Sequence, residues 1–131
     1  MIYLDANLFI YARFDYLQKG ERARKVLREI IEKGEAMTSV LALDEVMWVV
    51  LKNKKQGELR SVIEEIYSIP NLDVKEVPAH TAIRALDFME KYKLKPRDAF
   101  HVAVMKHFGV STIATDDPDF DKIEWMKRVR I

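Results

Sequence analysis

Apolar residues along this chain alternate between short continuous runs and longer stretches with helical spacing. A short apolar run bounded by polar residues indicates a buried strand, whereas apolar residues at i, i+3, i+4 and i+7 indicate one buried face of a helix. The pattern predicts four strands and a weaker fifth, with helices between them. The expected strands are residues 1–4, 35–38, 72–77 (as an edge strand), 110–114 and, as the weaker candidate, 127–131.

The same pattern predicts where helices begin and which faces they bury. Asn7 and Ser39 are expected to cap helices, because their side chains can accept a hydrogen bond from a free backbone N–H. The helix over 40–51 is apolar almost all round and is expected to be buried. The residues expected to be buried by the helix over 79–92 are Ile83, Leu86 and Met89. After a short helix at Asn7, the expected helices are residues 21–33, 40–51, 58–69, 79–92 and 96–108.

Long helical crossovers between the strands indicate a mainly parallel sheet. Right-handed crossovers place helices on both faces, which predicts an α/β three-layer sandwich with about five strands. Only four glycines and four prolines interrupt the chain, and no stretch has the composition of a linker. Residues 1–131 are therefore expected to form one domain.

Composition narrows the function classes. The chain has 22 Lys and Arg against 21 Asp and Glu, so a net charge of +1 gives no overall attraction to nucleic acid or to an anionic membrane. It has no cysteine, which excludes disulfides, thiolate zinc sites and cysteine nucleophiles. No apolar run is long enough to cross a bilayer and no signal segment is recognised, so the expected location is the cytoplasm.

Acidic residues follow the predicted strands at the edge where ligands bind in open parallel sheets. Asp5 follows the first strand and the acidic run 116–119 follows the fourth. Asp98 begins the helix that leads into the fourth strand, and Glu45 lies early in the helix that leaves the second. Each acid alone has a structural reading as a helix cap, a surface residue or a polar turn. Their convergence on one edge favours a common site.

Clustered carboxylates repel one another and take up protons unless a cation binds among them. Oxygen ligands favour a hard divalent ion, Mg²⁺ or Mn²⁺. Such ions bind phosphate oxygens and assist phosphodiester hydrolysis. The acids therefore predict a metal-dependent phosphodiesterase.

Four motifs in this order resemble those of PIN-domain ribonucleases, in particular the VapC toxins of type II toxin–antitoxin systems. The motifs are Leu-Asp-Ala-Asn at 4–7, the segment 39–46, Arg-Asp-Ala-Phe-His-Val-Ala at 97–103, and Ile-Ala-Thr-Asp-Asp-Pro-Asp-Phe-Asp at 113–121. The resemblance covers the whole chain. It implies a PIN-like fold, a Mg²⁺- or Mn²⁺-dependent endoribonuclease, a VapB-like antitoxin as partner and a homodimer.

The resemblance also implies roles for individual residues. The implied catalytic and metal-binding acids are Asp5, Glu45, Asp98 and Asp117. The implied supporting residues are Asn7, Thr115, Asp116 and Asp119. Since aspartate stands at both 116 and 117, the choice between them as the fourth core acid stays open.

Other residues have weaker signals. Arg97, which adjoins Asp98, is a candidate RNA contact, and Arg13 is a second. His101 stands one helical turn after Asp98, but an oxygen-rich site favours packing over metal binding for this residue. Trp48 is expected to pack in the core, with an interface as the second reading.

Two further functions remain open from the sequence. One is a PIN-fold RNA-processing nuclease without an antitoxin. The other is a catalytically inert PIN-fold module that binds RNA or protein. An aspartyl-nucleophile phosphotransferase ranks below both, because it requires a second aspartate where Asn7 stands.

Overall fold

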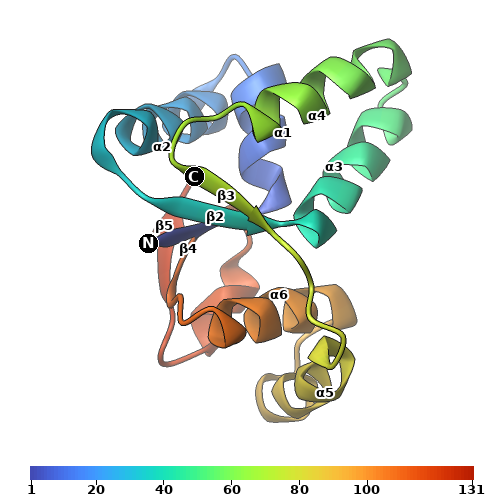
Figure 1. Cartoon of the computed structure of the whole chain (residues 1–131), viewed down its shortest axis with the longest axis vertical. Coiled ribbons are helices and arrows are strands. Elements are labelled where there is room, and N and C mark those ends of the chain that lie inside the picture. Colours follow the sequence, from blue (N-terminus) through green and yellow to red (C-terminus); the bar gives the residue numbers. More distant parts are fainter.

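The strands form one fully parallel sheet at the centre of the molecule (Figure 1). A computed structural model describes residues 1–131. The strands are β1 (Ile2–Leu4), β2 (Ala36–Ser39), β3 (Leu72–Lys75), β4 (Thr112–Thr115) and β5 (Lys127–Arg130). Their order in the sheet is β3-β2-β1-β4-β5. The predicted parallel sheet is therefore confirmed, as are the edge position of β3 and the existence of the weak fifth strand.

Six α-helices and two short 3₁₀ helices connect the strands. They are α1 (Ala6–Phe14), α2 (Gln18–Lys33), α3 (Val40–Lys52), η1 (Gln56–Glu58), α4 (Leu59–Tyr67), α5 (Thr81–Tyr92), α6 (Pro96–His107) and η2 (Pro118–Lys122). Helix α2 begins before the expected Glu21, with Gly20 in its first turn. The backbone N–H of Gly20 donates to Asp15 Oδ2 at 2.6 Å, and a Cβ at this position would lie 1.9 Å from the Asp15 carbonyl oxygen. Only glycine permits this close approach.

Helices cover both faces of the sheet, which gives the predicted three layers. In Figure 1, α1 to α4 lie on one side of the strands and α5 and α6 lie on the other. Alternate strand residues feed the two cores, since successive side chains in a strand point to opposite faces. Leu4 and Ala114 belong to the core with α1 to α4, whereas Tyr3 and Ile113 belong to the core with α6.

Of the two predicted helix caps, Asn7 is wrong, and Ser39 is confirmed in position but not in its hydrogen bond. Asp5, not Asn7, caps α1, because its Oδ1 accepts a hydrogen bond from the N–H of Ala6 at 2.8 Å. Ser39 occupies the position before α3 but its side chain makes no capping bond. Its hydroxyl instead lies 2.8 Å from the hydroxyl of Tyr3. The side chains of Asn7 and Ser39 therefore bond to residues of the strands, Thr115 and Tyr3, and do not cap a helix.

Helix α3 is only half buried, contrary to the expectation from its apolar composition. It buries Ala42, Leu43, Val46 and Val50 and exposes Val40, Met47, Trp48 and Leu51. Trp48 is the most exposed of these apolar side chains, with 63% of its surface accessible. The core position expected for Trp48 is therefore wrong.

Of the three residues predicted to be buried by α5, Met89 is partly buried against the core, whereas Ile83 and Leu86 are exposed. Ile83 is 69% exposed and Leu86 is 51% exposed. The helix packs mainly on α6, and it turns Ala85 and Tyr92 inward, with Phe88 stacked against Tyr92 at a ring distance of 6.3 Å. Ala85 and Tyr92 pack in the same core as α6. The periodicity of apolar residues along α5 does not by itself show which side of the helix faces α6. None of the helices has the length and apolar content needed to cross a membrane.

Candidate active site

The register of the two central strands brings Asp5 and Thr115 side by side. Leu4 of β1 pairs with Ala114 of β4, so the next residue of each strand lies at the carboxyl edge of the sheet. Thr115 Oγ1 donates to Asp5 Oδ2 at 2.7 Å, and the N–H of Ala6 donates to Oδ1. Asp5 is only 6% exposed. Because each carboxylate oxygen of Asp5 accepts a hydrogen bond, the orientation of the carboxylate is fixed.

Asn7 and Thr115 connect the two strand ends. Asn7 Nδ2 donates to Thr115 Oγ1 at 3.2 Å and to Asp5 Oδ2 at 3.4 Å. Asn7 Oδ1 accepts from the N–H of Asp116 at 3.3 Å, and Thr115 Oγ1 accepts from the N–H of Asp117 at 3.1 Å. These contacts agree with a supporting position for both residues beside Asp5.

The acids gather in two adjacent groups. Asp5, Glu45 and His101 offer ligand atoms within 4.8 Å of one another, and Asp98, Asp117 and Asp119 do the same. Burial, together with the negative charges of Asp117 and Asp5, raises the pKa of Asp98 to about 6. Asp98 of the second group stands one helical turn before His101 of the first group on α6, so the two groups are adjacent. The structure thus brings together all four acids expected at this edge.

Asp116 lies in a different network from Asp117. Its Oδ2 accepts hydrogen bonds from the Tyr11 hydroxyl at 2.9 Å and from Lys19 Nζ at 2.8 Å. Burial raises the pKa of Asp116, but the bonds from Lys19 and Tyr11 outweigh that effect and lower it. Asp117 instead accepts from the N–H of Asp119 at 2.9 Å and caps η2. Of these two neighbours, Asp117 is the one grouped with Asp98.

The sequence predicts that His101 packs within its helix, but in the structure this residue contacts the acids of the site. Its ring is 1% exposed. Nδ1 lies 2.6 Å from the Tyr3 hydroxyl, and Nε2 forms a hydrogen bond with Glu45 Oε1. Burial lowers the pKa of His101, but the bond to Glu45 and the charges of the nearby aspartates outweigh it and raise the pKa. A histidine one turn after Asp98 in an apolar helix was the available signal.

The two arginines proposed as RNA contacts differ in their surroundings. Arg97 is exposed in the first turn of α6, next to Asp98. Arg13 lies in the last turn of α1, away from Asp5 at the start of that helix. It pairs with Glu58 at 3.4 Å and with Glu65. Arg13 therefore joins α1 to α4.

The chemistry of these donors fits a hard divalent cation. Asp98, Asp117 and Asp119 offer carboxylate oxygens only, which Mg²⁺ and Mn²⁺ prefer. Burial raises the pKa of Asp98 most, and the negative charges of Asp117 and Asp5 raise it further. A cation bound among them would favour the ionised form of Asp98. The residues that could hold such an ion lie in the two groups described above, which together contain Asp5, Glu45, Asp98 and Asp117.

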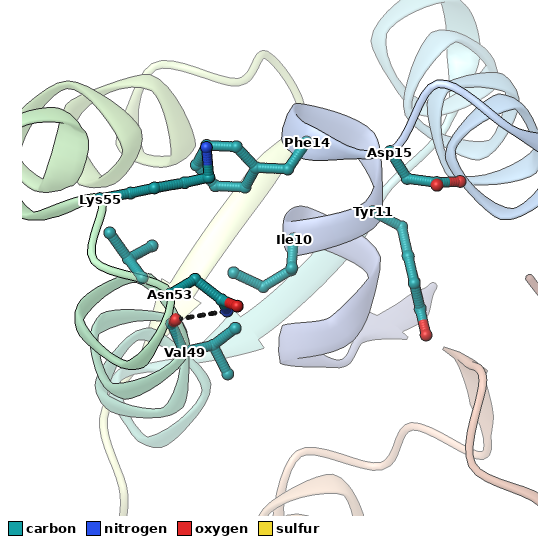
Figure 2. Close-up of a pocket in the computed structure, with 8 residues that line it drawn as sticks. Ile10, Tyr11, Phe14, Asp15, Val49, Asn53 and Lys55 are labelled. Carbon is teal, nitrogen blue, oxygen red and sulfur yellow. Dashed lines mark hydrogen bonds between the residues drawn. The ribbon is translucent and has the colours of Figure 1, made fainter.

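A separate apolar pocket of about 230 Å³ lies between α1 and α3. Figure 2 shows Ile10 and Val49 facing each other across it, while the ring of Phe14 lies beside the Lys55 chain. None of the clustered acids lines this pocket. Tyr11 borders it, but Figure 2 shows the hydroxyl of Tyr11 directed away from Ile10, and that hydroxyl bonds to Asp116. The acidic site is therefore distinct from the pocket.

Comparison with known proteins identifies the family. The PIN domain family model matches residues 2–126. Ribonuclease VapC13 of Mycobacterium tuberculosis is 26% identical over 138 residues, covering 98% of this chain and 99% of the relative. VapC20 of M. tuberculosis, described as a sarcin–ricin loop cleaving toxin, superposes with a TM-score of 0.82 at 17% identity over 100% of both chains. VapBC2 of Rickettsia felis, bound to a promoter DNA fragment, gives 0.76 at 19% identity, covering 99% of this chain and 98% of that one. The chain therefore belongs to the PIN domain family.

Proposed function

We propose that this PIN domain, residues 1–131, is a Mg²⁺- or Mn²⁺-dependent endoribonuclease and the toxin of a VapBC-type toxin–antitoxin pair. The observation that carries the proposal is the convergence of carboxylates from four chain segments at the carboxyl ends of β1 and β4. Similarity over nearly the full length to a protein named Ribonuclease VapC13 supports it. Such an enzyme would act in the cytoplasm, where its RNA substrate is found.

Asp5 and Asp98 would have different roles in hydrolysis. Asp5 is fixed by Thr115 and Ala6, so it offers a preorganised carboxylate with little orientational freedom. Asp98 is ionised at neutral pH, because its pKa in the metal-free protein is about 6 and a bound cation would favour the ionised form further. As a carboxylate it can accept a proton from an attacking water. A divalent cation held by Asp5, Glu45, Asp98 and Asp117 would lower the pKa of a bound water and neutralise charge on the phosphate.

Basic residues beside the acids supply the contact with RNA that the neutral chain lacks overall. Lys93, Lys95 and Arg97 are exposed between α5 and the first turn of α6. Phosphate contacts of this kind position a nucleic acid without reading its sequence. We propose that Arg97, beside Asp98, draws the scissile phosphate toward the acidic site.

Two protein partners are proposed. An antitoxin is supported by the solved relatives, which include a toxin–antitoxin complex from Klebsiella pneumoniae. A homodimer is supported by the exposed residues Met47, Trp48 and Leu51 of α3, because a contiguous apolar patch on a helix face typically marks an interface. We assign this face to a second copy of the chain, since an isologous interface needs only one self-complementary patch.

The test is cleavage of a mixed panel of tRNA and rRNA fragments with Mn²⁺, with Mg²⁺ and with EDTA. Wild type is compared with Asp98→Asn and with Asp44→Asn, a control at an acid of α3 outside the cluster. Wild type and the control should cleave only with metal, and Asp98→Asn should not cleave. Equal cleavage by all three proteins would point to a contaminating nuclease. Metal binding without cleavage of any RNA would favour the inert binding module.

The growth of a bacterial host that expresses the protein distinguishes a toxin from an RNA-processing enzyme. Expression of wild type in a bacterial host should arrest growth, and Asp98→Asn should not. Co-expression of a short reading frame found beside this gene should restore growth if it encodes the antitoxin. Normal growth despite cleavage in vitro would favour an RNA-processing nuclease without an antitoxin.

A further inference from the structure

Glu45 differs from the other clustered acids in how it is held. Asp5 receives hydrogen bonds from Ala6, Thr115 and Asn7. Glu45 extends from α3 on a longer side chain, and His101 Nε2 is its one hydrogen-bond partner. A glutamate loses more rotamer freedom than an aspartate when it is fixed in place. The orientation of the Glu45 carboxylate therefore depends on His101.

The hydrogen-bond chemistry determines which ring nitrogen carries the hydrogen toward Glu45. An ionised carboxylate only accepts hydrogen bonds, so Nε2 must donate. This holds whether the ring is neutral or charged, because Nε2 carries a hydrogen in both forms. A nitrogen that carries a hydrogen has no lone pair free to bind a metal ion.

The other side of the ring is fixed from within the sheet. Nδ1 lies 2.6 Å from the Tyr3 hydroxyl, which lies 2.8 Å from Ser39 Oγ. The rings of Tyr3 and His101 also meet edge to face, with centroids 5.5 Å apart. All three side chains are buried. The chain of contacts from Ser39 through Tyr3 to His101 therefore allows the imidazole one orientation.

We propose that His101 is a positioning residue that orients Glu45 toward Asp5 through its Nε2–H, with Tyr3 and Ser39 orienting the ring in turn. His101 Nε2 lies 3.8 Å from Asp5 Oδ1, so the same ring nitrogen that bonds to Glu45 lies close to Asp5. Helix α6 thus carries Asp98 directly and sets Glu45 indirectly, which ties both groups of acids to one rigid element. This inference rests on the proposed metal-dependent function.

The experiment compares His101→Gln with His101→Asn. The amide nitrogen of glutamine reaches the place of Nε2, whereas the shorter asparagine reaches only the place of Nδ1. Both variants replace the ring with a polar amide, so they share the general cost of losing the imidazole. Mn²⁺ affinity is measured by calorimetry, and kcat and KM are measured separately on a cleaved RNA. Melting curves check that each variant is folded.

Asparagine should weaken Mn²⁺ affinity by about 10- to 100-fold, the usual effect of losing a residue that orients a metal ligand. It should lower kcat with KM for RNA unchanged, and glutamine should recover most of both losses. In a Glu45→Gln background, His101→Asn should cost little more, because the residue it positions is already altered. Pulsed EPR of bound Mn²⁺ should show no directly bonded histidine nitrogen.

Several results would overturn the positioning role. These are unchanged Mn²⁺ affinity in a folded His101→Asn variant, equal losses in both variants, an undiminished loss in the Glu45→Gln background, or a histidine nitrogen bonded to Mn²⁺. Failure of the wild type to bind Mn²⁺ would overturn it as well. A wild type that binds Mn²⁺ but cleaves no RNA would overturn the nuclease alone, since the affinities would still test His101.

Discussion

Asp116 and Asp117 are adjacent in the chain, yet their carboxylates belong to separate networks. Asp116 bonds to Tyr11 and Lys19, while Asp117 caps η2 and is grouped with Asp98 and Asp119. An aspartate that is already paired with a lysine has little to offer a cation. The geometry therefore favours Asp117 as the fourth core acid, which the sequence motif left open.

Substitution separates these two aspartates. Asp117→Asn should reduce RNA cleavage by at least about 100-fold, a typical loss for a group that stabilises developing charge. Asp116→Asn should change kcat/KM by less than about threefold, the range of a surface substitution outside the site. Initial rates on one labelled RNA measure both. If Asp116→Asn reduced cleavage more than Asp117→Asn, the assignment of Asp117 as the fourth core acid would be wrong.

Ionised Asp98 should lower the folding stability of the metal-free protein at high pH. The pKa of Asp98 in the folded protein, about 6, lies above its ordinary value of 3.8. The favourable contribution of Asp98 is thus complete below the ordinary value and is lost as the pH rises through 6. An asparagine in its place would not ionise, so Asp98→Asn should stabilise the metal-free protein at pH 8 by about 1 kcal/mol after solvent screening, with little effect at pH 4.

Urea unfolding in EDTA at the two pH values gives this difference directly. Addition of Mg²⁺ at pH 8 should stabilise wild type but not Asp98→Asn, since a ligand stabilises only the state that binds it. A variant less stable than wild type at pH 8 in EDTA would show that Asp98 has a structural role instead.

Arg97 and Arg13 should differ in what their loss affects. Arg97→Ala should raise KM for RNA and reduce the salt dependence of binding, because it removes one phosphate contact. Arg13→Ala should leave KM unchanged and cost about 0.5–1 kcal/mol of stability, because the half-buried arginine pairs with partly exposed glutamates. RNA titrations at several salt concentrations, together with urea unfolding, test both. A higher KM for Arg13→Ala would extend the RNA-binding surface to the far end of α1.

The exposed face of α3 should govern self-association. Trp48→Glu should shift the protein toward the monomer, measured by light scattering after gel filtration, with little change in melting temperature because the side chain is 63% exposed. Ile83→Glu, at a similarly exposed apolar residue on α5, is the control and should leave the dimer intact. A monomeric wild type, or loss of the dimer only with Ile83→Glu, would contradict the assignment of this face.

The strands and the convergence of the acids at one edge of the sheet could be predicted from the sequence, because both depend on local or strongly constrained signals. A short apolar run followed by Asp5 marks a strand end, and parallel topology then brings the strand ends together. Helix faces were harder to predict. The choice between Ala85 and Leu86 as the buried residue of α5 depends on how closely that helix approaches α6, which single-chain periodicity does not encode.

The contacts within the site depend on distances between segments far apart in the chain. Tyr3 looked like an ordinary strand residue and Ser39 like a helix cap, but both hydroxyls contribute to the network around His101. Only the register of β1 against β2, with Tyr3 opposite Met37, places them together. His101 had a visible signal in its spacing from Asp98, but its partner Glu45 lies 56 residues away.

The most direct measurement is cleavage of a susceptible RNA in H₂¹⁸O with Mg²⁺, followed by mass spectrometry of the new ends. Attack by water on phosphorus should leave a linear phosphate monoester that carries one ¹⁸O, with no 2′,3′-cyclic phosphate. Cleavage should stop in EDTA and in Asp5→Asn. A cyclic phosphate without ¹⁸O, formed equally well in EDTA, would mean that the RNA's own 2′-hydroxyl is the nucleophile and that the acidic site is not a metal-dependent hydrolase.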